Sequence, residues 1–212
     1  MRTTQASGIA SMLFVHGLGL AITLLAALHT ASAASAPAVV VQINGTPTFE
    51  RAGKTQSLQP GTALDRGDIV ITDDRSKVRI VLADDSVLSV GPQSRLIIES
   101  LTLEGQGRNG RLQVLSGSFK IAISKWLSGP TDYAIRTPTA VAGVRGTIVW
   151  GDIELDSVCA LDGQIEVRSR KGGAPANLNA GQCVQKMGLG SPVPIKPSPA
   201  DLAAYLKAVT LD

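Results

Sequence analysis

The chain has 212 residues, of which 20 are basic and 17 acidic, and a formal net charge of +3. Because this charge is weak and evenly mixed, it argues against a nucleic-acid-binding protein. Only 3% of the residues are aromatic, which also argues against a base-stacking surface. Frequent Gly and Pro, with Val and Ile prominent among the apolar residues, predict one domain of short strands and tight turns.

The N-terminus has the features of an export signal. Arg2 precedes an uncharged run from Ile9 to Leu28, and Ala31-Ser32-Ala33 follows as a small-residue cleavage pattern. We expect residues 1–33 to be removed after Ala33, which predicts a periplasmic protein that is not an integral membrane protein. The alternative is an uncleaved anchor, because the apolar run is about long enough to span a bilayer.

The sequence offers little for catalysis. Cleavage would remove His16 and His29, the two histidines of the chain. The mature chain would then lack Ser-His and Cys-His nucleophile pairs and His-ligated metal sites. Aspartates cluster in turns without the spacing of a calcium-binding loop. We therefore predict that the protein is not an enzyme and needs no metal or cofactor.

From Val39 onward, short strand-like runs alternate with turn residues. Asn44-Gly45, Ser116-Gly117 and Asp162-Gly163 predict β-hairpins. A change in the parity of apolar positions predicts a bulge near Glu99-Ser100, and Glu104–Gly110 predicts a loop because it has no apolar residue. Residues 34–190 are therefore expected to form an all-β antiparallel sandwich or jelly roll, with a β-solenoid as the alternative architecture.

The tail changes in composition. Residues 191–197 form a proline-rich segment that reads as a linker. Ser198 and Pro199 are typical of the first positions of a helix, and residues 198–212 are expected to form a short amphipathic helix. Such a helix is too short to be stable alone, so it must dock on its own domain or on another protein. Its apolar stripe is Leu202, Tyr205, Leu206 and Val209.

Three further residues are candidates for structural or binding roles. Cys159 and Cys183 are the two cysteines of the chain, and in an exported protein they predict a disulfide, with two free buried thiols as the alternative. Trp126 lies in a predicted loop, where it either covers the edge of the core or contacts a partner. Trp126 and Tyr205 are thus possible partner contacts.

The segment TPTAVAGVRGT, Thr137 to Thr147, lies between two strand-like runs. Pro138 must interrupt a sheet ladder, and Gly143 and Gly146 permit backbone angles that other residues avoid. Arg145 is a single charge among small and apolar residues. We interpret the segment as a corner between two strands, with Arg145 as a structural clamp on a carboxylate; the alternative is an exposed contact with an anion or a partner.

This segment resembles the signature of the FecR family, periplasmic regulators of iron-siderophore signalling. The motif residues are Thr137, Pro138, Gly143, Arg145, Gly146 and Thr147. Further segments resemble that family in the same order along the chain, so the resemblance covers roughly Gly45 to Val184. These segments are PGTALDRGDIVIT (Pro60–Thr72), VRIVLADDSVLSVGPQSRLII (Val78–Ile98), LQVLSGSFKI (Leu112–Ile121) and CALDGQIEV (Cys159–Val167).

The resemblance implies a FecR-like β domain over residues 34–190 and a role in signalling. Many FecR proteins carry a cytoplasmic anti-sigma region before a membrane span, whereas few residues precede the apolar run here. We therefore expect a non-enzymatic periplasmic binding or signalling module that engages an envelope protein of unknown identity. The alternative is a carbohydrate- or peptidoglycan-binding module with a cell-wall glycan as its ligand, although sugar sites usually contain more aromatic residues.

Overall fold

The computed structural model describes residues 37–104, 107–124 and 130–211. The predicted export signal and the predicted role of Trp126 fall on residues outside these ranges. Contacts along the chain divide it after Ala33, and Ala34–Asp212 forms a compact unit with its own hydrophobic core. Within the described ranges, none of the helices combines the length and the hydropathy needed to span a bilayer.

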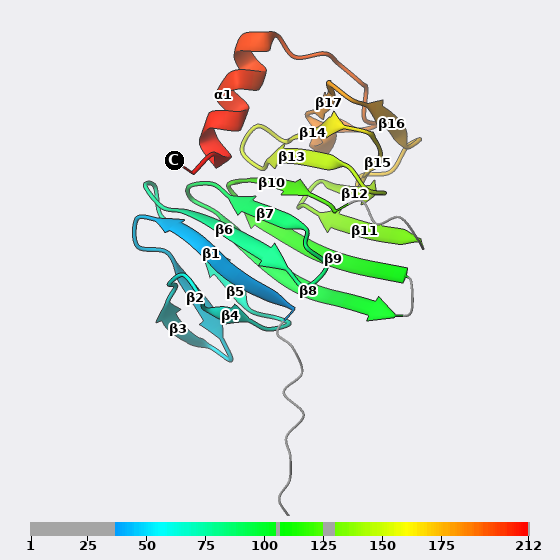
Figure 1. The fold of residues 1–212 in the computed structure, drawn as a ribbon. Helices are drawn as coiled ribbons and strands as arrows, with labels where there is room; N and C mark the ends of the chain where they lie inside the picture. The colour runs from blue at the N-terminus through cyan, green and yellow to red at the C-terminus, as the bar shows by residue number, and fades with distance from the viewer. Residues whose placement is uncertain (1–36, 105–106, 125–129, 212) are drawn as a thin grey trace, which may run out of the picture. The chain divides into compact units, whose positions relative to one another are not determined.

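Two β-sheets face each other and enclose the core (Figure 1). Sheet A has eight strands in the order β17-β14-β13-β10-β7-β6-β1-β4, and sheet B has nine in the order β16-β15-β12-β11-β9-β8-β5-β2-β3. Neighbouring strands are antiparallel, except that β9 and β11 are parallel. The predicted antiparallel all-β sandwich is therefore confirmed, and the solenoid alternative is not.

The strands of sheet A are β1 (Ala38–Asn44), β4 (Ala63–Leu64), β6 (Lys77–Leu82), β7 (Val87–Val90), β10 (Ser118–Ala122), β13 (Ile148–Asp152), β14 (Ser157–Asp162) and β17 (Gln182–Gln185). The strands of sheet B are β2 (Thr48–Arg51), β3 (Lys54–Ser57), β5 (Ile69–Ile71), β8 (Arg95–Glu104), β9 (Gly107–Ser116), β11 (Thr131–Arg136), β12 (Ala140–Val144), β15 (Gln164–Ser169) and β16 (Ala176–Asn179). A short 3-10 helix, η1 (Met187–Leu189), and helix α1 (Pro199–Val209) complete the chain.

The three turns predicted as hairpins instead carry the chain from one sheet to the other. Asn44-Gly45 leads from β1 to β2, and Ser116-Gly117 and Asp162-Gly163 make the same kind of passage. At Gly117 φ is +75°, and a Cβ atom would overlap Ser94 of the β7–β8 connection. The hairpin predictions were wrong because a tight turn reverses the chain without determining which sheet receives the next strand. Seven passages between the sheets have a glycine with positive φ: Gly45, Gly61, Gly67, Gly117, Gly146, Gly163 and Gly181.

Of the two predictions made for β8 and β9, the bulge is confirmed and the loop was wrong. The register of β8 against β9 shifts between Ile98 and Ser100, which confirms the predicted bulge. The loop predicted at Glu104–Gly110 was wrong, since Gly107–Gly110 belongs to β9. Arg108 explains the difference: its guanidinium points inward and is bound by polar partners, so the strand needs no apolar residue there.

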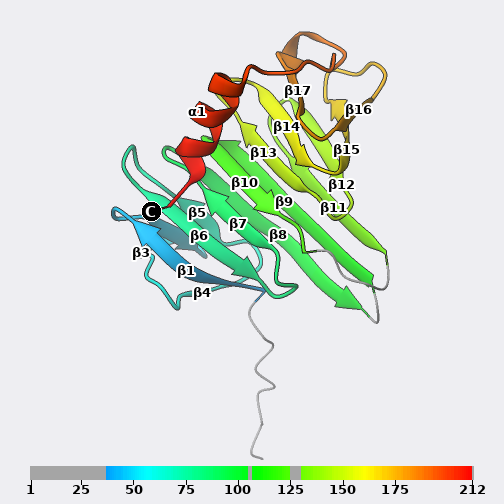
Figure 2. The ribbon, with the colours of Figure 1, turned by 45° about the horizontal axis from the view of Figure 1, so that its top comes forward.

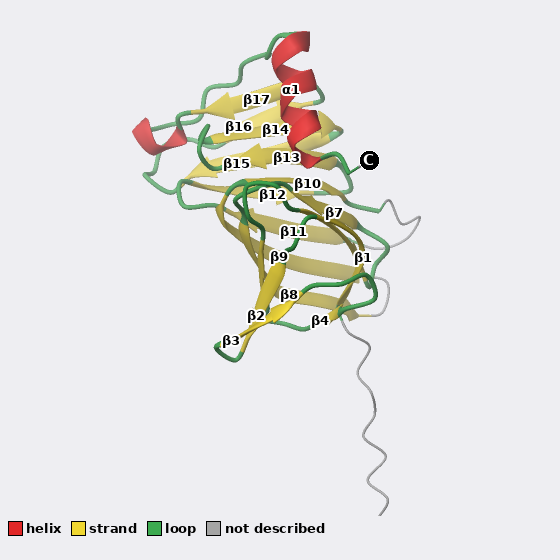
Figure 3. Cartoon of the chain, turned by 90° about the vertical axis from the view of Figure 1, so that its left-hand side faces the viewer, coloured by secondary structure: helices red, strands yellow, loops and turns green. Residues whose placement is uncertain are grey.

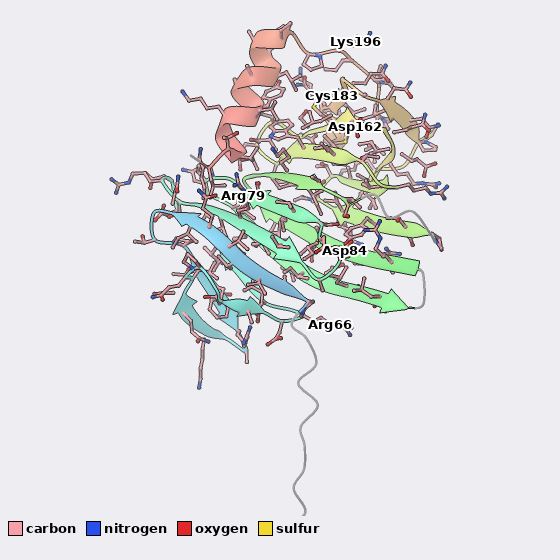
Figure 4. All side chains as sticks on the ribbon, viewed as in Figure 1. Arg66, Arg79, Asp84, Asp162, Cys183 and Lys196 are labelled. Carbon is pink, nitrogen blue, oxygen red and sulfur yellow. A yellow bond between two sulfur atoms is a disulfide. The ribbon has the colours of Figure 1, made fainter. Side chains whose placement is uncertain are left out.

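A polar cluster lies inside the otherwise apolar sandwich. The Asp84 side chain is fully buried in the β6–β7 turn (labelled in Figure 4). One of its oxygens accepts hydrogen bonds from Tyr133 Oη at 2.6 Å and from Ser86 Oγ at 2.9 Å, and forms an ion pair with Arg108 at 3.2 Å. Arg108 also donates to Thr131 Oγ1 at 3.0 Å and to the carbonyl of Ser124.

This cluster joins the two sheets, because Asp84 follows β6 of sheet A whereas Arg108 and Tyr133 come from β9 and β11 of sheet B. Gly110 belongs to the same arrangement: a Cβ atom there would overlap the Tyr133 ring, so only glycine lets the ring reach Asp84. Buried charges require both pairing and hydrogen bonds, and this cluster supplies both.

Helix α1 covers part of the outer face of sheet A (Figure 2). Ser198 is its N-cap and accepts a hydrogen bond from the Asp201 amide at 3.1 Å. Tyr205 stacks on Trp150 of β13 with ring centroids 4.4 Å apart. Val209 is buried beside Trp150 and both cysteines. The predicted short C-terminal helix is therefore confirmed, and it docks on its own domain.

The buried ion pair predicts a large loss of stability when one partner is removed. Arg108→Met should lower the free energy of unfolding by about 3–5 kcal/mol, because the Asp84 carboxylate would remain buried without its cation. Urea denaturation of the wild type, Arg108→Met, Asp84→Asn and the double variant would measure this. We expect the double variant to lose less than the sum of the two single variants; additive losses would contradict the coupling.

Burial of Tyr133 raises the pKa of its phenol well above the ordinary 10.0, and the hydrogen bond to the Asp84 carboxylate adds to this shift. Since the folded pKa is raised, this group favours folding below about pH 10, and that contribution is lost as the pH rises further. The chain has two tyrosines, so in Tyr205→Phe the ultraviolet absorbance reports on Tyr133 alone. We expect tyrosinate to form only together with alkaline loss of the near-ultraviolet circular dichroism. Tyrosinate near pH 10 in a chain that is still folded would contradict the buried geometry.

Candidate binding surface around Arg145

The segment from Thr137 to Thr147 forms a turn, a strand and a sheet-to-sheet passage. It was predicted as one corner between two strands, but β12 lies in its middle. Ala140, Ala142 and Val144 alternate into the core, so the intervening side chains face outward. Small residues conceal this alternation in the sequence, which is why the strand was not predicted.

Thr137 organises the turn before β12. It is buried, and its Oγ1 accepts hydrogen bonds from the amides of Ala140 at 2.9 Å and Thr139 at 3.3 Å. Pro138 occupies the exposed position between them, where no sheet partner needs its missing N–H. The Thr139 hydroxyl donates to the Asp156 carboxylate of the β13–β14 turn. The first half of the motif thus fixes where β12 begins.

The second half carries the chain into sheet A. Gly146 has φ of +65°, which suits glycine, and the chain then enters β13. Thr147 is buried and packs against the Gly163 backbone, where a Cβ atom would overlap its methyl group. These two residues therefore have a structural role, and Arg145 just before them points away from the core.

Arg145 is exposed, and no carboxylate of the described residues lies within ion-pair distance of it. The clamp interpretation requires such a carboxylate, so the geometry favours the alternative of an exposed contact. The nearby carboxylates already have arginine partners. Asp132 pairs with Arg111 at 2.7 Å, and Glu166 pairs with Arg168 at 2.8 Å.

A hollow of about 330 Å³ lies beside Arg145 on the outer face of sheet B. Gly143 is part of its lining: a Cβ atom built there would meet only the Glu166 carbonyl oxygen, at 3.8 Å. The missing side chain therefore leaves open space between β11, β12 and β15. The lining residues are Asp132, Gly143, Val144, Arg145, Gln164, Ile165, Glu166 and Asn177.

This surface can bind an anion through one arginine and neutral groups through several amides. A guanidinium donates to a carboxylate in a planar, two-pronged geometry, and Gln164 and Asn177 offer both donors and acceptors. The described residues contain no group of His, Cys, Asp and Glu side chains arranged to hold a metal ion.

The other predicted residues lie away from the hollow. Cys159 and Cys183 are directly opposite each other on β14 and β17, with Cα atoms 3.9 Å apart, and are joined in a disulfide (Cys183 is labelled in Figure 4). Tyr205 is half-buried against Trp150, and its hydroxyl accepts from Gln185 Nε2 at 3.2 Å. A partner contact by Tyr205 remains a prediction.

Sequence reasoning missed several residues that matter here. Trp150 has a fully buried ring that faces α1, although it sits in a run that reads as a simple strand. Gln164, Glu166 and Asn177 alternate with the buried residues Ile165 and Leu178. That alternation in the sequence could have identified these three residues as facing outward. The sequence could not show that β15 pairs with β12.

The fold and the site define a β-sandwich module with an exposed arginine beside a hollow on the outer face of sheet B. A family model described as FecR protein matches residues 68–174, and the chain belongs to this family. The match includes Arg145 and ends before β16 and α1.

Two crystal structures of a protein assigned as an anti-sigma factor from Parabacteroides distasonis, at 1.65 and 2.50 Å resolution, share the fold. In each case the TM-score is 0.50 and the sequence identity 14%, over 65% of this chain. The aligned part spans 64% and 63% of the chains in those structures, less than two thirds of their length. Comparison with curated protein sequences gives no match.

The disulfide predicts a measurable share of stability. Cys159→Ser with Cys183→Ser should lower the free energy of unfolding by about 3 kcal/mol, because the bond closes a loop of roughly 25 residues in the unfolded chain. Chemical denaturation under non-reducing conditions would measure the loss. Mass analysis of the wild type without reductant should find no free thiol, and two alkylatable thiols would contradict the bond.

Proposed function

We propose that this protein is a non-enzymatic periplasmic signalling module that binds an envelope protein through the surface around Arg145. Membership of the FecR family supports a regulatory role in signalling. The apolar run near the N-terminus and the disulfide support a location outside the cytoplasm.

The observation that carries this proposal is the charge of Arg145, which has no ion-pair partner among the described residues. The neighbouring outer-face arginines Arg111, Arg136 and Arg168 each have a carboxylate partner. Arg145 instead extends beside a hollow that a glycine keeps open. Arginine is enriched at protein interfaces, where its fork and its apolar stem both contribute to binding. A partner carboxylate beside Arg145 would complete the pattern of this face.

The form of the surface favours a protein over a small substrate. The hollow lies on the face of a sheet, and residues from β11, β12, β15 and β16 line it. A protein side chain can enter it while the surrounding partner surface covers the sheet. The polar groups Gln164, Glu166 and Asn177 also suit sugar hydroxyls, but the lining contains no aromatic ring for a sugar to stack on. The glycan alternative is therefore the second candidate.

The test is photo-crosslinking in the source cells, with the crosslinking amino acid at Asn177, which is exposed and lines the hollow. Arg145→Ala should reduce the yield of a discrete protein adduct about tenfold or more, because the central charged contact is lost. Gly143→Val should do the same by filling the hollow, while the free space around that position leaves the fold intact. The readout is mass spectrometry of the crosslinked band.

The matched control substitution is Lys120→Ala, on β10 of sheet A. In a separate variant, the crosslinking amino acid replaces Lys120 itself. We expect the control substitution to leave the Asn177 adduct unchanged and all variants to keep the wild-type melting temperature. Transfer of the crosslink to cell-wall glycan would favour the second candidate. An adduct that is indifferent to both Arg145→Ala and Gly143→Val would refute the proposed surface.

A further inference from the structure

Three exposed apolar residues lie on two loops that are joined by hydrogen bonds. Leu189 is 86% exposed, Val193 67% and Leu155 47%. Single exposed apolar residues are common on protein surfaces, whereas a group of them on adjoining loops indicates an interaction site. We call Leu155, Leu189 and Val193 the apolar tip.

Leu189 and Val193 belong to one closed loop. Cys183 and Ile195 exchange two backbone hydrogen bonds of 2.8 Å, so the chain between them leaves the sheet and returns to the same point. Met187 is buried and anchors the loop, and its carbonyl accepts from Ser169 Oγ at 2.9 Å. Figure 3 shows η1 as the short red helix standing outside the two sheets. Loops of this kind, with joined ends, are frequently functional.

Leu155 is held next to this loop by Asp156. The Asp156 carboxylate accepts from the Gly188 amide at 2.8 Å, and its carbonyl accepts from the Lys186 amide at 2.9 Å. Asp156 and Gly188 are therefore in direct contact, and Leu155 and Leu189 are the residues next to them in the sequence. These hydrogen bonds hold the turn that carries Leu155 against the loop that carries Leu189.

Basic residues lie on the loop of the apolar tip and on the connection beside it. Lys186 and Lys196 lie on or directly after the closed loop, and Arg170 and Lys171 lie on the adjoining β15–β16 connection; all four are exposed (Lys196 is labelled in Figure 4). The acidic residues beside the tip are Asp152, whose carboxylate accepts from the Leu155 amide at 2.9 Å, Glu154, which is exposed, and Asp156, whose two oxygens accept from Thr139 and Gly188. Four basic residues therefore accompany three acidic ones.

We propose that the apolar tip binds the surface of an anionic phospholipid bilayer. Leu189 and Val193 would enter the boundary between headgroups and acyl chains, while these lysines and Arg170 lie near the lipid phosphates. Apolar side chains bordered by basic ones are the combination that interfacial binding requires. A projecting loop also suits a deformable lipid surface better than the flat face of a protein. This site is separate from the Arg145 surface.

The test is sedimentation of the unit Ala34–Asp212, which has its own core, with sucrose-loaded vesicles. The vesicles contain either phosphatidylcholine alone or phosphatidylcholine with about 30% phosphatidylglycerol. We expect binding to the anionic vesicles, at least about tenfold weaker binding to the neutral ones, and a loss of several-fold between 0.1 and 0.5 M salt. Leu189→Ser with Val193→Ser should weaken binding about tenfold or more, since the apolar contribution is lost.

The matched control replaces two exposed apolar residues elsewhere, Val41→Ser with Leu103→Ser, each 45% exposed. This control should bind vesicles like the wild type, and Lys171→Glu with Lys186→Glu should bind more weakly. Thermal melting checks that each variant is folded. Competition by soluble glycerol phosphate would show a site for free phosphate instead of a bilayer. No binding to anionic vesicles, equal binding to both vesicles, or equal losses in the tip and control variants would overturn the proposal, as would capture of a protein instead of lipid by the tip.

Discussion

The buried contact of the Asp84 carboxylate with Arg108 and Tyr133 is the interaction on which the remaining arrangement depends. It fixes the β6–β7 turn of sheet A against β9 and β11 of sheet B, and β11 pairs with β12 through residues 133–136. Because β12 ends at Val144, the position of Arg145 follows from this contact through the pairing of β11 with β12. A core of aliphatic residues alone would tolerate small shifts of one sheet against the other. A buried charge does not tolerate such shifts, because they would separate it from its partners.

Much of the secondary structure could be predicted from the sequence, because alternating residues such as Val78, Ile80 and Leu82 report burial directly. The bulge in β8 was visible for the same reason, as a change in that alternation. The sheet that receives each strand could not be predicted, since Ser116-Gly117 and Asp162-Gly163 look like ordinary hairpin turns. The sequence also marked Arg145 as unusual but not as unpaired, because ion pairing depends on strands that are distant along the chain.

The outer faces of the two sheets differ in what lies on them. Helix α1 covers part of the outer face of sheet A, where Tyr205 and Val209 close over Trp150 and the disulfide. The outer face of sheet B carries ion pairs, the hollow and Arg145. The family match covers Arg145 but not α1, so the helix that covers part of sheet A lies outside the part of the chain matched to the family. The proposed contact with another protein therefore uses the face that carries the family-matched Arg145.

The pairing of Ile195 with Cys183 has a consequence for the edges of the sheets. An outermost strand normally presents unpaired amides and carbonyls that invite a foreign strand to join. On β17, the outermost strand of sheet A, Ile195 occupies these groups at Cys183, and the disulfide ties the strand to β14. Lateral strand addition is thereby blocked at that point. The neighbouring edge of sheet B ends in β16, whose Asn177 lines the hollow, so an incoming strand at that edge would lie next to a strand that lines the hollow.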